Sequence, residues 1–182
     1  MHGKDRLPWV WGMLNVLGDE SDQRGFWQPD VTVASVVVRN GAFLIVEEDV
    51  QGQRVLNQPA GHLEPDESLL HAAVRETLEE SGWEVEPTAL IGCYQWKSAA
   101  NANEPEGNGN GRRHFLRVAI AATPLRHFPE RILDNGIVRA LWLTPAQLQD
   151  EAARHRSPLV WRVVQDYLAG QRLPLAALAH LS

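Results

Sequence analysis

The chain of 182 residues is long enough for one domain with a sizeable core, and its 44% apolar and 22% charged content is ordinary for a folded protein. Its formal net charge of -6, without any basic run, argues against a surface for nucleic acid polymers. The single cysteine, Cys93, excludes an internal disulfide and is consistent with a reducing cytoplasm.

Residues 1–29 are predicted to form an extension that packs on the domain or mediates a contact. Lys4 and Arg6 precede an apolar run at residues 9–17, as they would in an export signal. The run contains Asn15 and two tryptophans, and no cleavage site of small residues follows it. It is also too short to cross a bilayer, so an export signal stays the alternative and no membrane contact is expected.

Residues 30–182 are predicted to form a single α/β domain with a mixed β-sheet flanked by helices. The β-branched and apolar segments that predict strands are 31–39, 42–47, 89–96, 114–122 and 138–143. Asn40-Gly41 predicts a tight hairpin turn, and Gln51-Gly52 predicts a second turn. Helices are expected from Pro145 and from Ser157-Pro158. The glycine-rich, polar loop 98–112 is predicted to be a disordered hairpin tip or a lid.

An acidic stretch at residues 61–83, GHLEPDESLLHAAVRETLEESGW, is the most informative part of the chain. Glu76, Glu79 and Glu80 stand at i, i+3 and i+4, so a helix places their carboxylates on one face. Like charges crowded together repel, and this cost indicates a cation among them. Hard divalent cations such as Mg²⁺ bind carboxylate oxygens and retain waters and substrate phosphates as further ligands. The stretch therefore predicts metal-dependent phosphate chemistry.

A helix is expected to begin in the cluster 65–67 and to end at Gly82, which suits a left-handed terminus. Leu70, Val74 and Leu78 recur at i, i+4 and i+8. This spacing predicts an apolar stripe that faces the core, with the three carboxylates on the outer face.

The fixed positions of this stretch resemble the signature of the Nudix hydrolase family at Gly61, Glu67, Arg75-Glu76, Glu79-Glu80 and Gly82. The resemblance covers residues 31–145 and implies an α/β/α sandwich that hydrolyses a diphosphate linked to another group with a divalent cation. It further implies that the ligands of Mg²⁺, or of Mn²⁺, are the carboxylates of Glu76, Glu79 and Glu80 and the backbone carbonyl of Ala60. Arg75 resembles the arginine that orients the carboxylates, and Glu67 resembles its partner in holding the loop.

Sequences outside the acidic stretch resemble one group of bacterial Nudix phosphatases, from residue 31 to the C-terminus. Examples are VTVASVVV, NQPAGHLE and RSPLV. This resemblance implies hydrolysis of nucleoside tri- and diphosphates and of thiamine-type pyrophosphates, with release of orthophosphate. The departures are the N-terminal extension, the longer loop 98–112 and Leu56, where an aromatic residue is expected, and they bear on the substrate range.

Two other functions stay open. A dinucleotide or nucleotide-sugar pyrophosphohydrolase would use the same chemistry but release a nucleoside monophosphate. A nucleotide-sensing, Nudix-like binding module is expected to carry a degraded signature and a DNA-binding segment, whereas this signature is intact. The expected partner is a small nucleotide or pyrophosphate, and the chain is expected to be a monomer or a homodimer.

Hydrolysis requires a base that takes the proton of the attacking water. Glu76 is the first candidate because Arg75 can fix its orientation, and Glu79 is the second. An acid on a distant loop, Glu130 or Asp134, is the alternative.

Two residues are candidates for contact with the rest of the substrate. Gln58 stands beside the metal loop and can hydrogen-bond a phosphate or a base, and Trp96 can stack on a heterocycle, with edge packing as its alternative. The Arg156-Ser157 start of the last helix is predicted to pack, or else to present an anion-binding end. Cys93 is predicted to be a small buried strand residue rather than a nucleophile.

Overall fold

The computed structural model describes residues 28–98 and 113–181. The predictions for residues 1–27 and for the loop 99–112 lie outside the described residues. The strands are β1 (Asp30–Arg39), β2 (Ala42–Val50), β3 (Gln53–Asn57), β4 (Ala60–His62), β5 (Trp83–Lys97), β6 (His114–His127) and β7 (Ile137–Leu143). The helices are α1 (Leu69–Ser81), α2 (Pro145–Asp150) and α3 (Leu159–Leu168), and short 3-10 turns follow at Ala152–Arg154 and Leu175–Ala177.

Strand β1 joins two parts of one mixed sheet, whose main order is β3-β2-β1-β6-β5. Over most of its length β1 runs parallel to β6, and near its start it pairs antiparallel with β4 at Thr32 and His62. It pairs with β2 only near its end, where Val38 is opposite Phe43. The β2 part, with β3 and β7, therefore diverges from the β1, β5 and β6 part.

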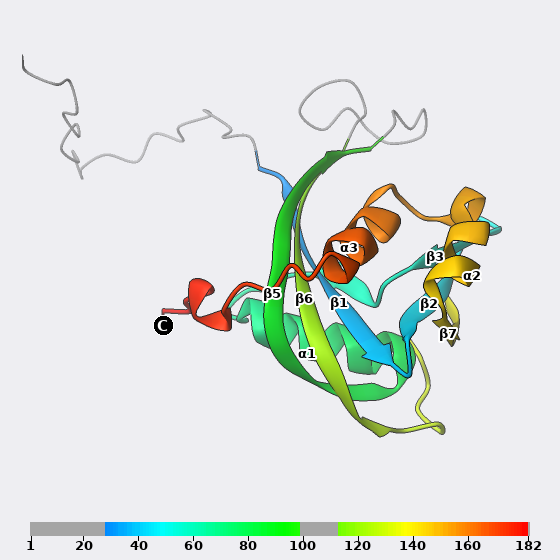
Figure 1. The fold of residues 1–182 in the computed structure, drawn as a ribbon, viewed down its shortest axis with the longest axis horizontal. Coiled ribbons are helices and arrows are strands. Elements are labelled where there is room, and N and C mark those ends of the chain that lie inside the picture. The colour runs from blue at the N-terminus through cyan, green and yellow to red at the C-terminus, as the bar shows by residue number, and fades with distance from the viewer. Residues whose placement is uncertain (1–27, 99–112, 182) are drawn as a thin grey trace, which may run out of the picture.

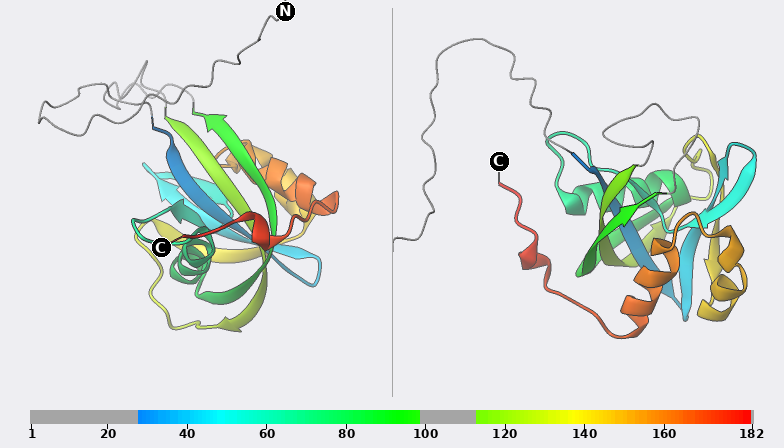
Figure 2. Two further views of the ribbon diagram at one scale, coloured as in Figure 1. Left: turned by 90° about the vertical axis from the view of Figure 1, so that its left-hand side faces the viewer. Right: turned by 90° about the horizontal axis from the view of Figure 1, so that it is seen from above.

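Helices α1 and α3 cover opposite faces of the β1, β5 and β6 part of the sheet (Figures 1 and 2). On the α1 side, Ala72 packs in one buried cluster with Val33 of β1 and Ile120 of β6. On the α3 side, Val160 packs in another cluster with Val36 of β1. The predicted α/β fold with a mixed sheet between helices is confirmed.

The predicted hairpin turn is present, with Asn40 and Gly41 at φ angles of 51° and 77°. Strand β5 begins at Trp83 rather than at residue 89, because its first residues pair with the end of β6 as far as His127. The three-residue strand β4 was not predicted. It is too short for a periodic pattern and forms only because β1 is beside it.

The prediction that Cys93 is buried was wrong, since its side chain is exposed. The next residue, Tyr94, turns toward α3 and donates a hydrogen bond to Asp166 at 2.9 Å. Alternation along a strand therefore directs Cys93 to the other face. None of the described helices is long and apolar enough to span a membrane.

Candidate active site

Helix α1 ends where the sequence predicts but begins later. Ser68 caps it by accepting a hydrogen bond from the His71 amide at 3.1 Å. Gly82 ends it in a left-handed conformation with a φ of 70°, and its amide donates to the Leu78 carbonyl. The prediction that the cluster 65–67 starts the helix was wrong, because a turn with Asp66 at a φ of 60° comes first.

The buried face of α1 also differs from the predicted one. Leu70 and Val74 of the predicted apolar stripe pack against buried clusters, but the residues of the stripe are only partly buried: Leu70, Val74 and Leu78. The buried residues of the helix are small or polar: Ala72, Ala73, Glu76, Thr77, Glu80 and Ser81. The small residues let the helix approach β1 so closely that the Ser35 hydroxyl donates to the Ala73 carbonyl at 3.1 Å. The predicted outward orientation of the acids was therefore wrong for Glu76 and Glu80.

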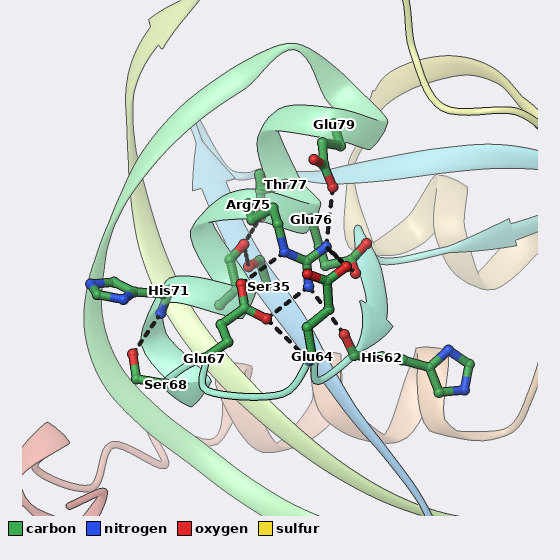
Figure 3. Close-up of polar contacts among 11 residues, drawn as sticks. Ser35, His62, Glu64, Glu67, Ser68, His71, Arg75, Glu76, Thr77 and Glu79 are labelled. Carbon is green, nitrogen blue, oxygen red and sulfur yellow. Dashed lines mark hydrogen bonds and ion pairs between the residues drawn. The ribbon is translucent and has the colours of Figure 1, made fainter. Parts of the chain in front are cut away.

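Arg75 is the central donor of the hydrogen bonds that connect the loop before α1 with the acids of the helix (Figure 3). Its guanidinium binds both carboxylate oxygens of Glu67, at 2.8 and 2.9 Å. It also donates to Glu76 at 2.7 Å, to Glu79 at 3.1 Å and to the carbonyl of His62 at 3.1 Å. One arginine thus ties the loop before α1 to two acids on the helix, as its planar fork of donors permits.

The backbone of β4 lies directly against the acids of α1. A Cβ atom added at Gly61 would lie 2.1 Å from the Glu76 carboxylate, so a side chain at this position would occupy the same space. The next contact is between Ala60 and Glu80, where the Ala60 amide donates to the Glu80 carboxylate at 2.8 Å. The glycine that opens the acidic stretch therefore makes room for Glu76, the first of the three acids on the helix.

Burial raises the pKa of two acids in this cluster, Glu76 and Glu80. For Glu80, burial and the neighbouring charges of Glu48, Glu76 and Asp134 together raise the pKa to about 8, although the hydrogen bond from Ala60 opposes this change. By contrast, the pKa of Glu67 is lowered, chiefly by its hydrogen bonds from Arg75.

The donor chemistry of the cluster fits a hard divalent cation, because the atoms that could bind a metal there are carboxylate and carbonyl oxygens. Glu80 gives the strongest support for a bound cation, because it is buried and its hydrogen-bond donor, the backbone amide of Ala60, carries no positive charge. Glu76 and Glu79 instead accept hydrogen bonds from Arg75. The described residues contain no group of three or more metal-binding side chains already placed to hold a cation. The two acids therefore have to share their oxygens between Arg75 and a cation.

Of the two loop acids proposed from the sequence, Asp134 is the one that the structure brings to the cluster. Its amide donates to the carbonyl of Glu79 at 3.1 Å. Its charge also raises the pKa of both Glu76 and Glu80. The contacts recorded for the described residues do not join Glu130 to these acids.

Gln58 is placed in packing contact with α3 rather than toward solvent. Its side chain is 1% exposed, and its amide nitrogen donates to the carbonyl of Val160 at 2.8 Å. Its side-chain oxygen is buried without a hydrogen-bond partner in the described part of the chain. This burial does not favour the predicted contact with substrate.

Trp96 lies at the other end of the sheet from the hairpin and stacks on Phe115 of β6. The ring centroids are 5.3 Å apart at an interplanar angle of 23°. The two rings line a hollow of about 270 Å³, together with Pro29 and Leu116. The contact with Phe115 is the edge packing named as the alternative, and the hollow leaves room for a flat heterocycle, so the stacking role stays a prediction.

A group of buried polar residues near the acids was missed by the sequence analysis. Arg117 of β6 and Asn57 of β3 are 9% and 3% exposed, and Glu48 of β2 is 8% exposed. The side-chain amide of Asn57 donates a hydrogen bond to the Glu48 carboxylate at 3.0 Å, and Arg156 also donates to Glu48. The available signal was Arg117 itself, a charge inside the apolar strand sequence HFLRVAIAAT.

Comparison with known proteins agrees with this geometry. Residues 28–162 match the NUDIX domain family. The chain is 38% identical over 149 residues to Phosphatase NudJ of Escherichia coli K12, covering 82% of this chain and 90% of the relative. It is similar to the structure of a NUDIX hydrolase from Nitrosomonas europaea, with a TM-score of 0.75, 41% identity and coverage of 85% and 98%. A MutT NUDIX hydrolase from Burkholderia pseudomallei shares the fold at a TM-score of 0.60, 18% identity and coverage of 77% and 98%.

Proposed function

The chain belongs to the NUDIX domain family and is a Nudix hydrolase, and from this premise we propose which bond it cleaves. The substrates are nucleoside tri- and diphosphates and thiamine-type pyrophosphates, and the product is orthophosphate. The similarity to a phosphatase along 82% of the chain supports this choice over the other members of the family. The compartment is the cytoplasm, where a nucleotide pool is available.

The observation that carries the proposal is the arrangement of acids around Arg75 and β4. Glu80 is a buried carboxylate without an ion pair or a hydrogen bond from a cationic side chain among the described residues, beside two further acids that Arg75 holds in place. Burying such a group is costly unless a cation compensates it. A divalent cation, Mg²⁺ before Mn²⁺, is therefore the cofactor that these residues suit.

We assign the cation ligands to the carboxylates of Glu76, Glu79 and Glu80 and to the backbone carbonyl of Ala60. When bound there, the cation supplies positive charge that stabilises the phosphate oxygens and acidifies a water. Arg75 fixes the rotamers of Glu76 and Glu79 through its hydrogen bonds, and Glu67 holds Arg75 in turn. These contacts preorganise the acids before substrate arrives.

The proton of the attacking water passes to a carboxylate of this cluster. Glu76 is our first candidate and Glu79 the second, since Arg75 orients both. Asp134 is the third candidate, because its backbone is bonded to Glu79. At the far end of the substrate, the Trp96 and Phe115 rings stack on the base or on the thiamine-type heterocycle.

A substrate panel tests the proposal, with Mg²⁺ and Mn²⁺ compared and with orthophosphate and pyrophosphate measured separately. Orthophosphate is expected from nucleoside diphosphates, nucleoside triphosphates and thiamine pyrophosphate. Pyrophosphate as the main product from triphosphates would contradict it. Nucleoside monophosphate from dinucleotides or nucleotide sugars would favour the pyrophosphohydrolase alternative, and binding without any product would favour a sensing module.

A further inference from the structure

Arg117 is a buried arginine that the proposed roles leave unused. It lies in β6, in register with Thr32 of β1, and is 9% exposed. Its guanidinium donates to the Thr32 hydroxyl at 3.4 Å and to the side-chain oxygen of Asn57 at 3.3 Å. Both bonds are long and both acceptors are neutral. Buried arginines are normally paired with an anion, so this one requires an explanation.

The acids nearest to Arg117 are committed to other donors. Glu48 accepts hydrogen bonds from Asn57 and from Arg156, and Glu80 accepts one from the Ala60 amide. The pKa of Arg117 is lowered to about 10, chiefly by burial and also by the charge of Arg156, while Glu48 and Glu80 oppose this change. Arg117 and Arg156 both interact with the charge of Glu48, and since both hydrogen-bond acceptors of Arg117 are neutral, its guanidinium can still accept an anion.

Arg117 also lies on the same face of the sheet as the aromatic pair. Residues two apart on a strand share a face, so Arg117 and Phe115 do so on β6, about 7 Å apart along the strand. Trp96 stacks on Phe115, and the charge of Glu80 acts on Arg117. The guanidinium itself extends over β1 toward Asn57 of β3, on the side of the acids.

We propose that Arg117, assisted by Arg156, binds a phosphate group of the substrate beside the phosphate that the acids engage. This inference rests on the proposed function of the same site. An arginine suits the role because its fork of donors matches two phosphate oxygens, and charge-assisted bonds are strong where water is excluded. The ligand class is a diphosphate or longer phosphate chain.

The test measures binding to the full-length chain by calorimetry, with Mg²⁺ present. The probe is methylenediphosphonate, whose bridging carbon prevents hydrolysis. Arg117→Gln is expected to weaken binding by about tenfold or more, and Arg117→Lys, which keeps the charge without the fork, by less. The matched control is Arg126→Gln, since Arg126 is an exposed arginine on the same strand and is expected to leave the affinity unchanged.

Mg²⁺ binding without the diphosphonate separates this role from a structural one. It is expected to stay within about twofold of wild type in Arg117→Lys, because that variant keeps the charge near Glu80. Loss of Mg²⁺ affinity with unchanged diphosphonate affinity would overturn the proposal. Thermal unfolding identifies the folded variants, and if Arg117→Gln does not fold, Arg117→Lys decides.

Two further results overturn the proposal: wild-type protein that does not bind the diphosphonate, and a folded Arg117 variant that binds it as tightly as wild type. The proposed hydrolysis is tested by a separate assay, which measures the release of orthophosphate. Binding that depends on Arg117 without orthophosphate release would refute the proposed activity and leave the phosphate site standing.

Discussion

At position 61 the backbone passes so close to the Glu76 carboxylate that any side chain there would displace it. Gly61→Ala would place a methyl group 2.1 Å from that carboxylate, which must then move. Because displacements of about 1 Å in an active site can cost roughly 100-fold, Mg²⁺-dependent turnover is expected to fall by about that factor. Gly92→Ala is the control, since its Cβ would have the Tyr94 side chain as its nearest neighbour, at 3.0 Å, rather than an acid of the cluster. Full turnover in Gly61→Ala would contradict the assigned role of Glu76.

Glu80 is the buried acid of the cluster that lacks an ion pair or a hydrogen bond from a cationic side chain among the described residues. Glu80→Gln keeps its shape and an oxygen that can accept the Ala60 amide, but removes the charge that a cation requires. Turnover is expected to be nearly abolished at every Mg²⁺ concentration, while circular dichroism stays that of wild type. Glu84→Gln, on an exposed acid of β5, is the matched control and should retain activity. A Glu80→Gln variant that regains full turnover with added Mg²⁺ refutes the assignment.

The regular spacing of the acids predicted that they share a helix face, but not which way that face turns. An i, i+3, i+4 pattern is a property of the helix alone. Whether the face is buried depends on β1 and β4, which reach α1 from elsewhere in the chain. The apolar stripe is only part of the packed face for the same reason: Leu70 and Val74 pack against buried clusters, but Ala72 and Ala73 are more deeply buried, since alanines allow closer packing against the sheet than leucines do.

At the scale of elements, the Glu67–Arg75 pair joins the loop after β4 to α1. Arg75→Lys keeps the charge but loses the two-pronged contact with Glu67 and the fork that reaches Glu76 and Glu79. Turnover is expected to fall by roughly 10–100-fold, as is typical for residues that orient metal ligands. Steady-state kinetics measure the fall.

A double-mutant cycle of Arg75→Lys with Glu67→Gln shows whether the two residues act as one unit. The loss in the double variant is then expected to be close to that of Arg75→Lys alone. Losses that simply add would mean that Glu67 does not act through Arg75. Arg126→Lys is the control, because Arg126 is an exposed arginine near the end of β6.

Helix α3 is fastened to the sheet by a hydrogen bond from the Tyr94 hydroxyl to Asp166, at 2.9 Å. Tyr94→Phe removes the donor and leaves Asp166 with its bond from Arg162. The free energy of unfolding is expected to fall by about 0.5–1.5 kcal/mol in a urea titration. Tyr167→Phe, on the same helix, is the comparison. An unchanged midpoint for Tyr94→Phe would mean that α3 is held by apolar packing alone.

Elements with a long or strongly marked pattern were predictable, and those that depend on a partner were not. The hairpin at Asn40-Gly41 and the end of α1 at Gly82 follow from local conformational preference. Strand β4 and the first residues of β5 form because β1 and β6 supply their hydrogen bonds. The local sequence therefore predicts that an element is present, whereas pairing with neighbouring strands sets the length of a strand.

At the scale of the whole molecule, the candidate site lies where the two parts of the sheet diverge from β1. Asn57 and Arg117 are 60 residues apart in sequence, and Gln58 contacts Val160 over 102 residues. The spacing of residues within one segment cannot predict contacts between residues so far apart in the sequence. The acids were therefore identified from the sequence, whereas Arg117 was not. The contact with Val160 gives Gln58 a packing role that its position beside the acidic stretch does not suggest.

A cation bound to α1 is expected to stabilise the entire fold, because α1 shares a buried cluster with β1 and β6. A ligand that binds only the folded state raises the free energy of unfolding by about 1.4 kcal/mol for each tenfold excess over its Kd. The melting temperature of wild type should therefore rise steadily with Mg²⁺ concentration, and that of Glu84→Gln should rise equally. Glu80→Gln should show almost no rise. A wild-type melting temperature that does not respond to Mg²⁺ would contradict a cation site on α1, because binding to the folded state cannot leave its stability unchanged.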